Sequence, residues 1–192
     1  MTAQPGRTAT DMTSETLEQL SPPGLARLAI ETYIGAAETM APPAHLNGIL
    51  AARAGAFVTL RMIDGRLRGC IGTIEATRPT LAEEVIYNAI NAATRDPRFQ
   101  PVDAGELGLL RYGVDVLSLP EPVRGPEDLD PARYGVIIET LEDGQRSLLL
   151  PAIAGIATVE EQWRAVHQKI GIRLGAPVSV KRFTVTRYGM KD

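Results

Sequence analysis

The sequence predicts a single α+β domain, in which β-hairpins and flanking helices accompany a mixed, largely antiparallel sheet. Asp-Gly pairs at residues 64–65 and 143–144 each lie between two apolar segments and predict two hairpins, and the first pair is typical of a two-residue hairpin turn. Helical periodicity occurs between and after the hairpins. The repeated strand–helix–strand rhythm of a doubly wound sheet does not occur, which favours the α+β class.

Each predicted element follows from local spacing. Apolar residues three and four positions apart predict three helices, and Thr80 and Glu83 stand as a capping box at the start of the second. Pro42-Pro43 and Asp96-Pro97 are expected to end the first two helices, because the residue before a proline disfavours helical geometry. The predicted helices span about residues 24–40, 80–95 and 159–170, and the predicted strands 57–63, 66–74, 109–119, 134–140, 146–150 and 178–188.

Composition narrows the class of protein. The chain has 192 residues, 44% hydrophobic and 22% charged, which is enough to bury a core without a metal or disulfide. Residues 1–20 are polar, so we expect a mobile tail and neither signal peptide nor membrane anchor, with the folded domain over residues 21–192. A net charge of −3 disfavours nonspecific nucleic-acid or membrane binding, and no later apolar run is long enough to span a bilayer. The lone cysteine cannot form an internal disulfide, which favours a cytoplasmic location.

That cysteine lies within residues 67–72, Leu-Arg-Gly-Cys-Ile-Gly, on the second strand of the first hairpin. Counting outward from a turn at Asp64-Gly65 pairs Thr59 with Cys70. The same count pairs Arg61 with Arg68, on the same side of the hairpin and opposite an apolar face. The thiol and both guanidinium groups are therefore expected to share one surface.

Cys70 has two interpretations. Nearby positive charge lowers the pKa of a thiol and would favour a nucleophile, and Gly69 and Gly72 would leave space for a substrate backbone. A lone cysteine in a strand is, however, more often a small buried apolar residue, and we favour that interpretation. His45 and His167 are the only histidines, and nothing in the sequence selects either as a partner of the thiol.

The two arginines are the sharper indication of a site. Like charges directly opposite on paired strands destabilise the pair, so an anion is expected between them. For Arg61 we favour an internal salt bridge to Glu84 or Asp96, and for Arg68, beside the glycines, an anionic ligand. The candidate internal carboxylates are those of Glu75, Glu83, Glu84 and Asp96.

Polar residues of the second helix and its exit are candidates for structural support. Glu84, Asn88, Asn91 and Arg95 form a stripe that is either a solvated face or, through the two amides, a tie to the backbone of a neighbouring loop. A charge-assisted turn is expected where Asp96 and Arg98 flank a proline.

The sequence predicts no metal and no cofactor. One cysteine and two separated histidines do not make a zinc site of usual spacing. Neither a Walker loop nor a dinucleotide-binding glycine fingerprint is present.

Residues 67–72, together with Asn88-Ala89 and the segment Arg95-Asp96-Pro97-Arg98-Phe99, resemble the AMMECR domain family. The resemblance covers about residues 22–188, and similar prokaryotic proteins are called AmmeMemoRadiSam system protein A. It implies an α+β fold with a larger and a smaller part, a cleft near the cysteine motif, and association with a Memo-type protein and a radical-SAM enzyme. The family has no settled activity.

Together, these observations predict an accessory or binding protein that takes an anionic small molecule or peptide beside residues 67–72. The predicted ligand-binding residues are Arg68, Gly69, Gly72, Arg61 and Thr59, supported by Asn88, Asp96 and Arg98. The alternative is an enzyme that uses Cys70 as nucleophile in covalent group transfer.

Overall fold

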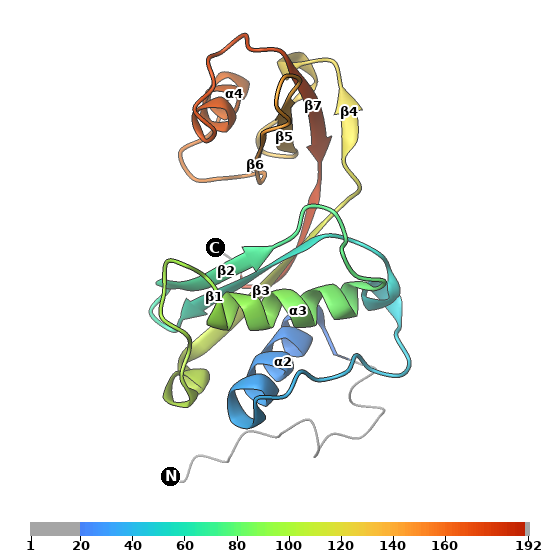
Figure 1. The fold of residues 1–192 in the computed structure, drawn as a ribbon, viewed down its shortest axis with the longest axis vertical. Helices are drawn as coiled ribbons and strands as arrows, with labels where there is room; N and C mark the ends of the chain where they lie inside the picture. The colour runs from blue at the N-terminus through green and yellow to red at the C-terminus, as the bar shows by residue number, and fades with distance from the viewer. Residues whose placement is uncertain (1–19, 191–192) are drawn as a thin grey trace. The chain divides into compact units, whose positions relative to one another are not determined.

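The computed structural model describes residues 20–190, which pack as two units (Figure 1). The larger unit comprises residues 20–116 and 187–190, and the smaller unit comprises residues 117–186. Each unit contains one four-stranded antiparallel sheet and at least one helix, so the predicted α+β class is confirmed. The polar tail predicted for residues 1–20 lies, except for Leu20, outside the described residues.

The larger unit is built on a sheet of order β2-β1-β3-β8. Helices α2 and α3 lie on one face of this sheet and share its core, because β1 directs Val58 and Leu60 toward them with no exposed surface. The elements of this unit are α2 (Pro22–Ala36), η2 (Gly48–Ala51), β1 (Ala56–Met62), β2 (Leu67–Gly72), α3 (Leu81–Thr94), η3 (Ala104–Leu109), β3 (Leu110–Leu117) and β8 (Val185–Gly189).

Helix α2 ends earlier than the sequence predicts. Ala37 adopts a left-handed conformation with φ of 57°, and its N–H bonds to the carbonyl of Tyr33, which closes the helix at Ala36. The prolines at 42–43 lie further along the chain, so the prediction of a helix to Met40 stopped by them is wrong. The local cap acts before the prolines do.

Helix α3 begins as predicted. The Thr80 side chain accepts from the N–H of Glu83, and the Glu83 carboxylate accepts from the N–H of Thr80, which completes the capping box. The helix is buried along most of its length and packs on β1 and β2. It therefore fixes the position of the strand that carries the cysteine.

The smaller unit is built on a sheet of order β4-β7-β5-β6, with α4 packed on β5 and β6. The hairpin predicted around Asp143-Gly144 is confirmed: β5 pairs with β6, residues 141–144 connect them, and Gly144 in this connection has a positive φ of 69°. The elements are β4 (Glu121–Val123), η4 (Pro126–Asp128), β5 (Gly135–Thr140), β6 (Arg146–Leu149), α4 (Val159–Gln168) and β7 (Val178–Phe183).

The predicted last strand, residues 178–188, is two strands. Strand β7 belongs to the sheet of the smaller unit and β8 to that of the larger unit, with Thr184 between them. Thr184 leaves the ladder because its N–H donates to the Ser118 hydroxyl and its carbonyl accepts from the Ser118 N–H. Apolar and polar residues continue to alternate through this break, so the sequence pattern does not reveal it.

Candidate functional site

The hairpin of β1 and β2 carries the cysteine motif in nearly the predicted register. Thr59 pairs with Cys70 as predicted, but the register shifts between Leu60 and Arg61, so that Arg61 pairs with Leu67. Arg68 is the additional residue of a β-bulge. The prediction that Arg61 and Arg68 face each other is therefore wrong.

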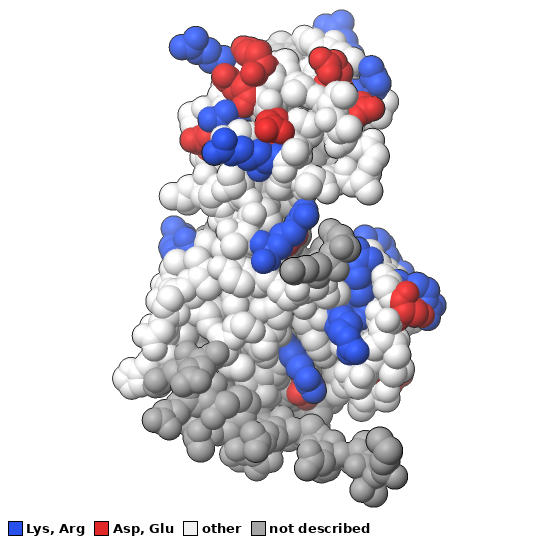
Figure 2. Space-filling view, turned by 180° about the vertical axis from the view of Figure 1, so that it is seen from behind, with Lys and Arg blue, Asp and Glu red and all other residues white. Residues whose placement is uncertain are grey.

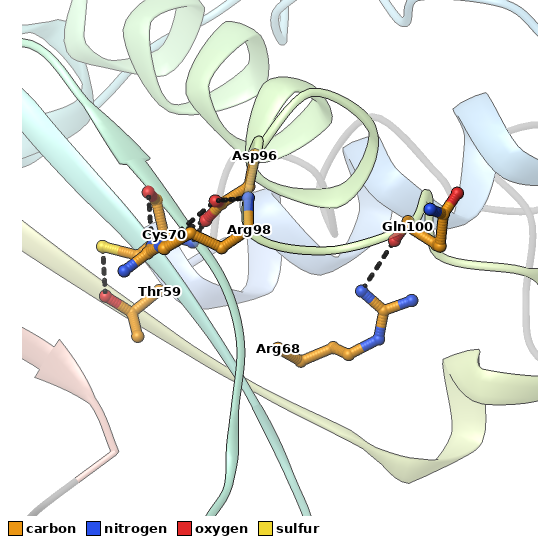
Figure 3. Close-up of polar contacts among 6 residues, drawn as sticks. All are labelled: Thr59, Arg68, Cys70, Asp96, Arg98 and Gln100. Carbon is orange, nitrogen blue, oxygen red and sulfur yellow. Dashed lines mark hydrogen bonds and ion pairs between the residues drawn. The ribbon is translucent and has the colours of Figure 1, made fainter.

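Arg68 is held by protein groups. Its Nε and Nη2 donate to the two carboxylate oxygens of Glu106, both at 2.7 Å, and its Nη1 donates to the carbonyl of Gln100 at 2.9 Å. Figure 3 shows the Arg68 side chain pointing away from Cys70 toward the Gln100 segment. The Arg68 side chain is only 14% exposed, and the guanidinium lowers the pKa of the Glu106 carboxyl through its hydrogen bonds. This geometry favours a structural role, and ligand binding by Arg68 stays a prediction.

Sequence reasoning did not consider Glu106. It lies 38 residues beyond Arg68, in the short helix η3, where Asp103 and Glu106 form a capping box. The Asp-x-x-Glu spacing of that box is visible in the sequence, but it indicates a helix start and not a partner for a distant arginine.

Both backbone polar groups of Cys70 form hydrogen bonds with the turn after α3 (Figure 3). The Cys70 N–H donates to Asp96 Oδ2 at 2.8 Å, and Arg98 Nη2 donates to the Cys70 carbonyl at 3.4 Å. Asp96 also accepts from the Arg98 side chain at 2.6 Å, and this bond, with the N–H groups of Cys70 and Arg98, holds the pKa of the Asp96 carboxyl far below its usual value. Strand β2 is a sheet edge, so Asp96 and Arg98 occupy groups that a further strand would otherwise pair with. The predicted charge-assisted turn is present in this geometry.

The Cys70 side chain lies beside Thr59. Its Sγ is 3.4 Å from the Thr59 hydroxyl, and the residue is half-buried. Neither His45 nor His167 has a hydrogen bond to Cys70 in the described part of the chain. The His45 side chain is exposed. The His167 side chain is buried, and its Nδ1 forms a hydrogen bond with the Trp163 carbonyl.

The glycines of the motif are packing positions. A Cβ on Gly69 would lie 2.2 Å from the carbonyl oxygen of Ala92, and one on Gly72 would lie 2.3 Å from the Phe57 ring. Gly69 thus lets α3 approach β2, and Gly72 accepts an aromatic ring. The space that we assigned to a substrate backbone is filled by protein at both positions, and ligand contact by either glycine stays a prediction.

Asn88 and Glu84 are buried, so their interpretation as a solvated stripe is wrong. The Asn88 amide donates to the Ala56 carbonyl at 3.0 Å, so it ties α3 to the backbone of strand β1, where the alternative interpretation expected both amides to hold a loop. The Glu84 carboxylate accepts from Thr73, Thr77 and the backbone of Arg78. It is therefore not a partner for Arg61, contrary to expectation.

Arg61 instead faces Arg111. The two residues are directly opposite on β1 and β3, on the face of the sheet away from α2 and α3; we call this the outer face, and it also carries Thr59 and Cys70. Arg61 donates to the carbonyl of Gly65 and Arg111 to that of Leu110. Neither guanidinium pairs with a carboxylate among residues 20–190, so the like charges oppose each other without an anion between them.

Charge elsewhere on the larger unit shows how unusual this pair is. Arg187 and Asp115, from β8 and β3, form an ion pair at 3.7 Å, and Arg66 bonds to Asp64 at the hairpin turn. In the view of Figure 2, Lys and Arg side chains predominate over Asp and Glu on the larger unit, while both kinds are mixed on the smaller unit. Arg61 and Arg111 add to this basic character without local neutralisation.

Neither a metal-binding cluster nor a membrane-spanning helix is found among the described residues. Over residues 20–190, no three His, Cys, Asp or Glu side chains come together in a group that could hold a metal ion. No helix in that range is long and apolar enough to cross a membrane.

Comparison with known proteins decides the family. The family model described as AMMECR1 matches residues 23–191. This chain belongs to the AMMECR1 family. The match confirms the resemblance carried by the cysteine motif and the Asp-Pro-Arg-Phe segment.

Relatives of this AMMECR1 member extend across bacteria and archaea. A protein from Thermotoga maritima is 49% identical over 161 residues, which cover 83% of this chain and 91% of the relative. The crystal structure of an uncharacterized protein from Pyrococcus horikoshii is 32% identical, with a TM-score of 0.79 over 88% of this chain and 90% of that one. A Clostridium acetobutylicum relative is 43% identical over 70% of this chain, which corresponds to only 28% of its own length.

Proposed function

We propose that this AMMECR1-family protein is an accessory protein that binds an anionic group on the outer face, beside residues 67–72. The observation that carries the proposal is the direct opposition of Arg61 and Arg111, neither of which has a carboxylate partner in the part of the chain that the structure describes. Such a pair costs stability in the free protein, and a carboxylate or phosphate between the two guanidinium groups would remove that cost.

The surroundings of the arginine pair define the ligand further. Thr59 precedes Arg61 by two residues on the same face, so its hydroxyl is on the side where the ligand would lie. The hydroxyl is within 3.4 Å of the Cys70 thiol, which places two neutral polar groups next to the charged pair. We therefore favour a small molecule or peptide with an anionic end and a hydrogen-bonding group beside it.

We also propose that the protein works with a Memo-type protein and a radical-SAM enzyme, as the family resemblance implies. The Clostridium relative supports work alongside another protein, because there the matched region occupies only 28% of a longer chain. Affinity purification from the native cell, followed by identification of the proteins that remain bound, tests this association. Recovery of neither partner type would contradict it.

The anion site is tested by thermal unfolding of the full chain in inorganic phosphate, with sodium chloride of equal ionic strength as reference. Phosphate is expected to raise the Tm of the native protein above the chloride value, because a ligand that binds the folded state stabilises it. The double variant Arg61→Gln/Arg111→Gln should lose most of that rise.

The matched control is Arg124→Gln, which removes an exposed arginine of the smaller unit. It should retain the full response to phosphate. An equal phosphate response in the double variant would refute the site, whatever the response of the control.

A second candidate function, nucleophilic catalysis by Cys70, rests on the half-buried thiol and its contact with the Thr59 hydroxyl. An activated thiol reacts with an electrophile such as iodoacetamide much faster than a free thiol does at neutral pH. Labelling at the rate of free cysteine, or slower, would count against this candidate and leave the accessory function in place.

A further inference from the structure

The larger unit contains a cavity of about 350 Å³ between α3 and the segment that follows α2. Tyr33 and Met40 form one wall, and Ile86 and Ile90 of α3 form the other. Helices α2 and α3 lie on the inner side of the sheet, so this cavity is separate from the outer face. Its volume is within the range of pockets that hold small organic molecules.

One polar group in this cavity lacks a partner. Asn91 lines the cavity and is only 8% exposed, yet its side-chain amide makes no hydrogen bond with any residue from 20 to 190. A side-chain amide offers two donors and a carbonyl acceptor. The Asn91 amide is therefore available to a molecule within the cavity.

Asn88 differs from Asn91 in what its amide nitrogen does, although the buried Asn88 Oδ1 has no hydrogen-bond partner. It lies one turn earlier on the same helix and is fully buried, and its Nδ2 donates to the Ala56 carbonyl and contacts Thr73. Asn88 thus holds α3 to the sheet. Asn91 has no such internal partner and is directed at the cavity.

The charged residues of the cavity are mainly basic. Arg78 and Arg95 line it, and neither guanidinium pairs with a carboxylate among the described residues. Arg78 instead stacks on the Tyr87 ring, 4.3 Å from its centroid. Glu83 is the acidic residue of the lining, and its carboxylate is occupied by the capping box at Thr80.

The geometry points to a binding site for a small amphipathic organic anion, with an aromatic or aliphatic body and a carboxylate. The body would pack between the tyrosine and isoleucine side chains of the walls. A carbonyl or hydroxyl of the ligand would hydrogen-bond the Asn91 amide, and its carboxylate would pair with Arg95, one helical turn further along α3. A peptide or protein partner is disfavoured because the cavity is the size of a single metabolite.

The test uses 3-phenylpropionate and its neutral counterpart 3-phenylpropionamide as probes of the full-length protein. In proton–nitrogen NMR spectra, the carboxylate is expected to shift the side-chain signals of Asn91 and Arg95. Calorimetric titration should show binding that Arg95→Gln weakens about tenfold, as expected for the loss of one charge-assisted contact. The neutral amide should bind native protein about as weakly as the carboxylate binds Arg95→Gln.

Arg124→Gln is the matched control, because it removes an exposed arginine of the smaller unit that belongs to neither proposed site, and it should leave the titration unchanged. Asn91→Leu should also weaken binding while keeping Tm equal or higher, since it replaces an unpartnered buried amide with an apolar side chain. Shifts that spare Asn91 and Arg95, or equal affinity in native protein and Arg95→Gln, would overturn the proposal. Arg95 is exposed, so this second readout does not depend on whether Asn91→Leu folds. Because phosphate is not a probe here, failure of this site leaves the outer-face proposal standing.

Discussion

Four arginines close to residues 67–72 form two contrasting pairs. Arg68 and Arg98 each bond to a carboxylate, at 2.7 and 2.6 Å, and each also donates to backbone carbonyls. Arg61 and Arg111 face each other across two strands, and within residues 20–190 their guanidinium groups donate to carbonyl oxygens alone. The first pair holds the hairpin to the segments after α3, and the second pair carries charge that the fold does not neutralise. Counting carboxylate partners thus separates structural arginines from candidates for ligand binding.

The substitution Asp96→Ala is expected to change stability most, and it tests the pair of arginines that bond to carboxylates. Asp96 is 4% exposed and accepts from the backbone of Cys70 and from both backbone and side chain of Arg98. Its loss should lower the free energy of unfolding by about 2–4 kcal/mol, measured by urea denaturation. Asp64→Ala, at an exposed turn, is the control and should cost clearly less. Equal losses in the two variants would mean that the hydrogen bonds of Asp96 to Cys70 and Arg98 contribute little to the free energy of unfolding.

The same carboxylate should make stability depend on pH. The pKa of Asp96 is lowered in the folded protein, so its contribution is complete above the unfolded pKa of about 4 and disappears as pH falls through the folded value. The Tm of the native protein should therefore fall as the pH is lowered, and the Tm of Asp96→Ala should fall less over the same pH range. Parallel curves for the two proteins between neutral pH and the acid limit of solubility would contradict this assignment.

An intermediate effect is expected for Arg68→Met. This change removes a bidentate ion pair and leaves the Glu106 carboxylate, 24% exposed, without its partner. We expect a loss of about 1–3 kcal/mol, and a double-mutant cycle with Glu106→Gln should give a coupling energy of about 1 kcal/mol or more. Unchanged stability together with a lost phosphate response would instead assign Arg68 to the ligand site.

The smallest effect has the opposite sign. Arg111→Gln should raise stability by about 0.2–1 kcal/mol at low ionic strength, because it removes one of two opposed like charges. The gain should fade as salt is added, since screening weakens the repulsion in the native protein as well. Urea denaturation at two salt concentrations measures both quantities. A variant that is less stable than native protein at low salt would contradict the claim that Arg61 and Arg111 repel each other in the folded protein.

Local signals in the sequence were sufficient for much of this region. Alternation and the Asp-Gly turn predicted the pairing of Thr59 with Cys70, and the Asp-Pro-Arg spacing predicted the turn of Asp96 and Arg98. Both depend on residues within one hairpin or one turn. That Asn88 ties α3 to a neighbouring backbone was also among the stated alternatives, although a loop was expected there and the partner is strand β1.

The remaining features depend on contacts far apart in the chain. The bulge at Arg68 accompanies its bond to Glu106, 38 residues away, and no local pattern specifies that partner. Arg111 opposes Arg61 only because β1 pairs with β3 as well as with β2. Which strand lies beside a given strand is a tertiary property that the alternation within one strand does not specify.

The break at Thr184 has a consequence for how the chain folds. Strands β3 and β8 are neighbours in one sheet, yet residues 118–184, which make up nearly all of the smaller unit, are inserted between them in sequence. The larger unit therefore cannot acquire its last strand until the ribosome has released the whole insertion. Closing a flexible loop of that length is entropically unfavourable, and prior folding of the insertion would shorten the effective loop. Folding of the smaller unit is thus expected to limit the rate at which β8 pairs with β3 in the sheet of the larger unit.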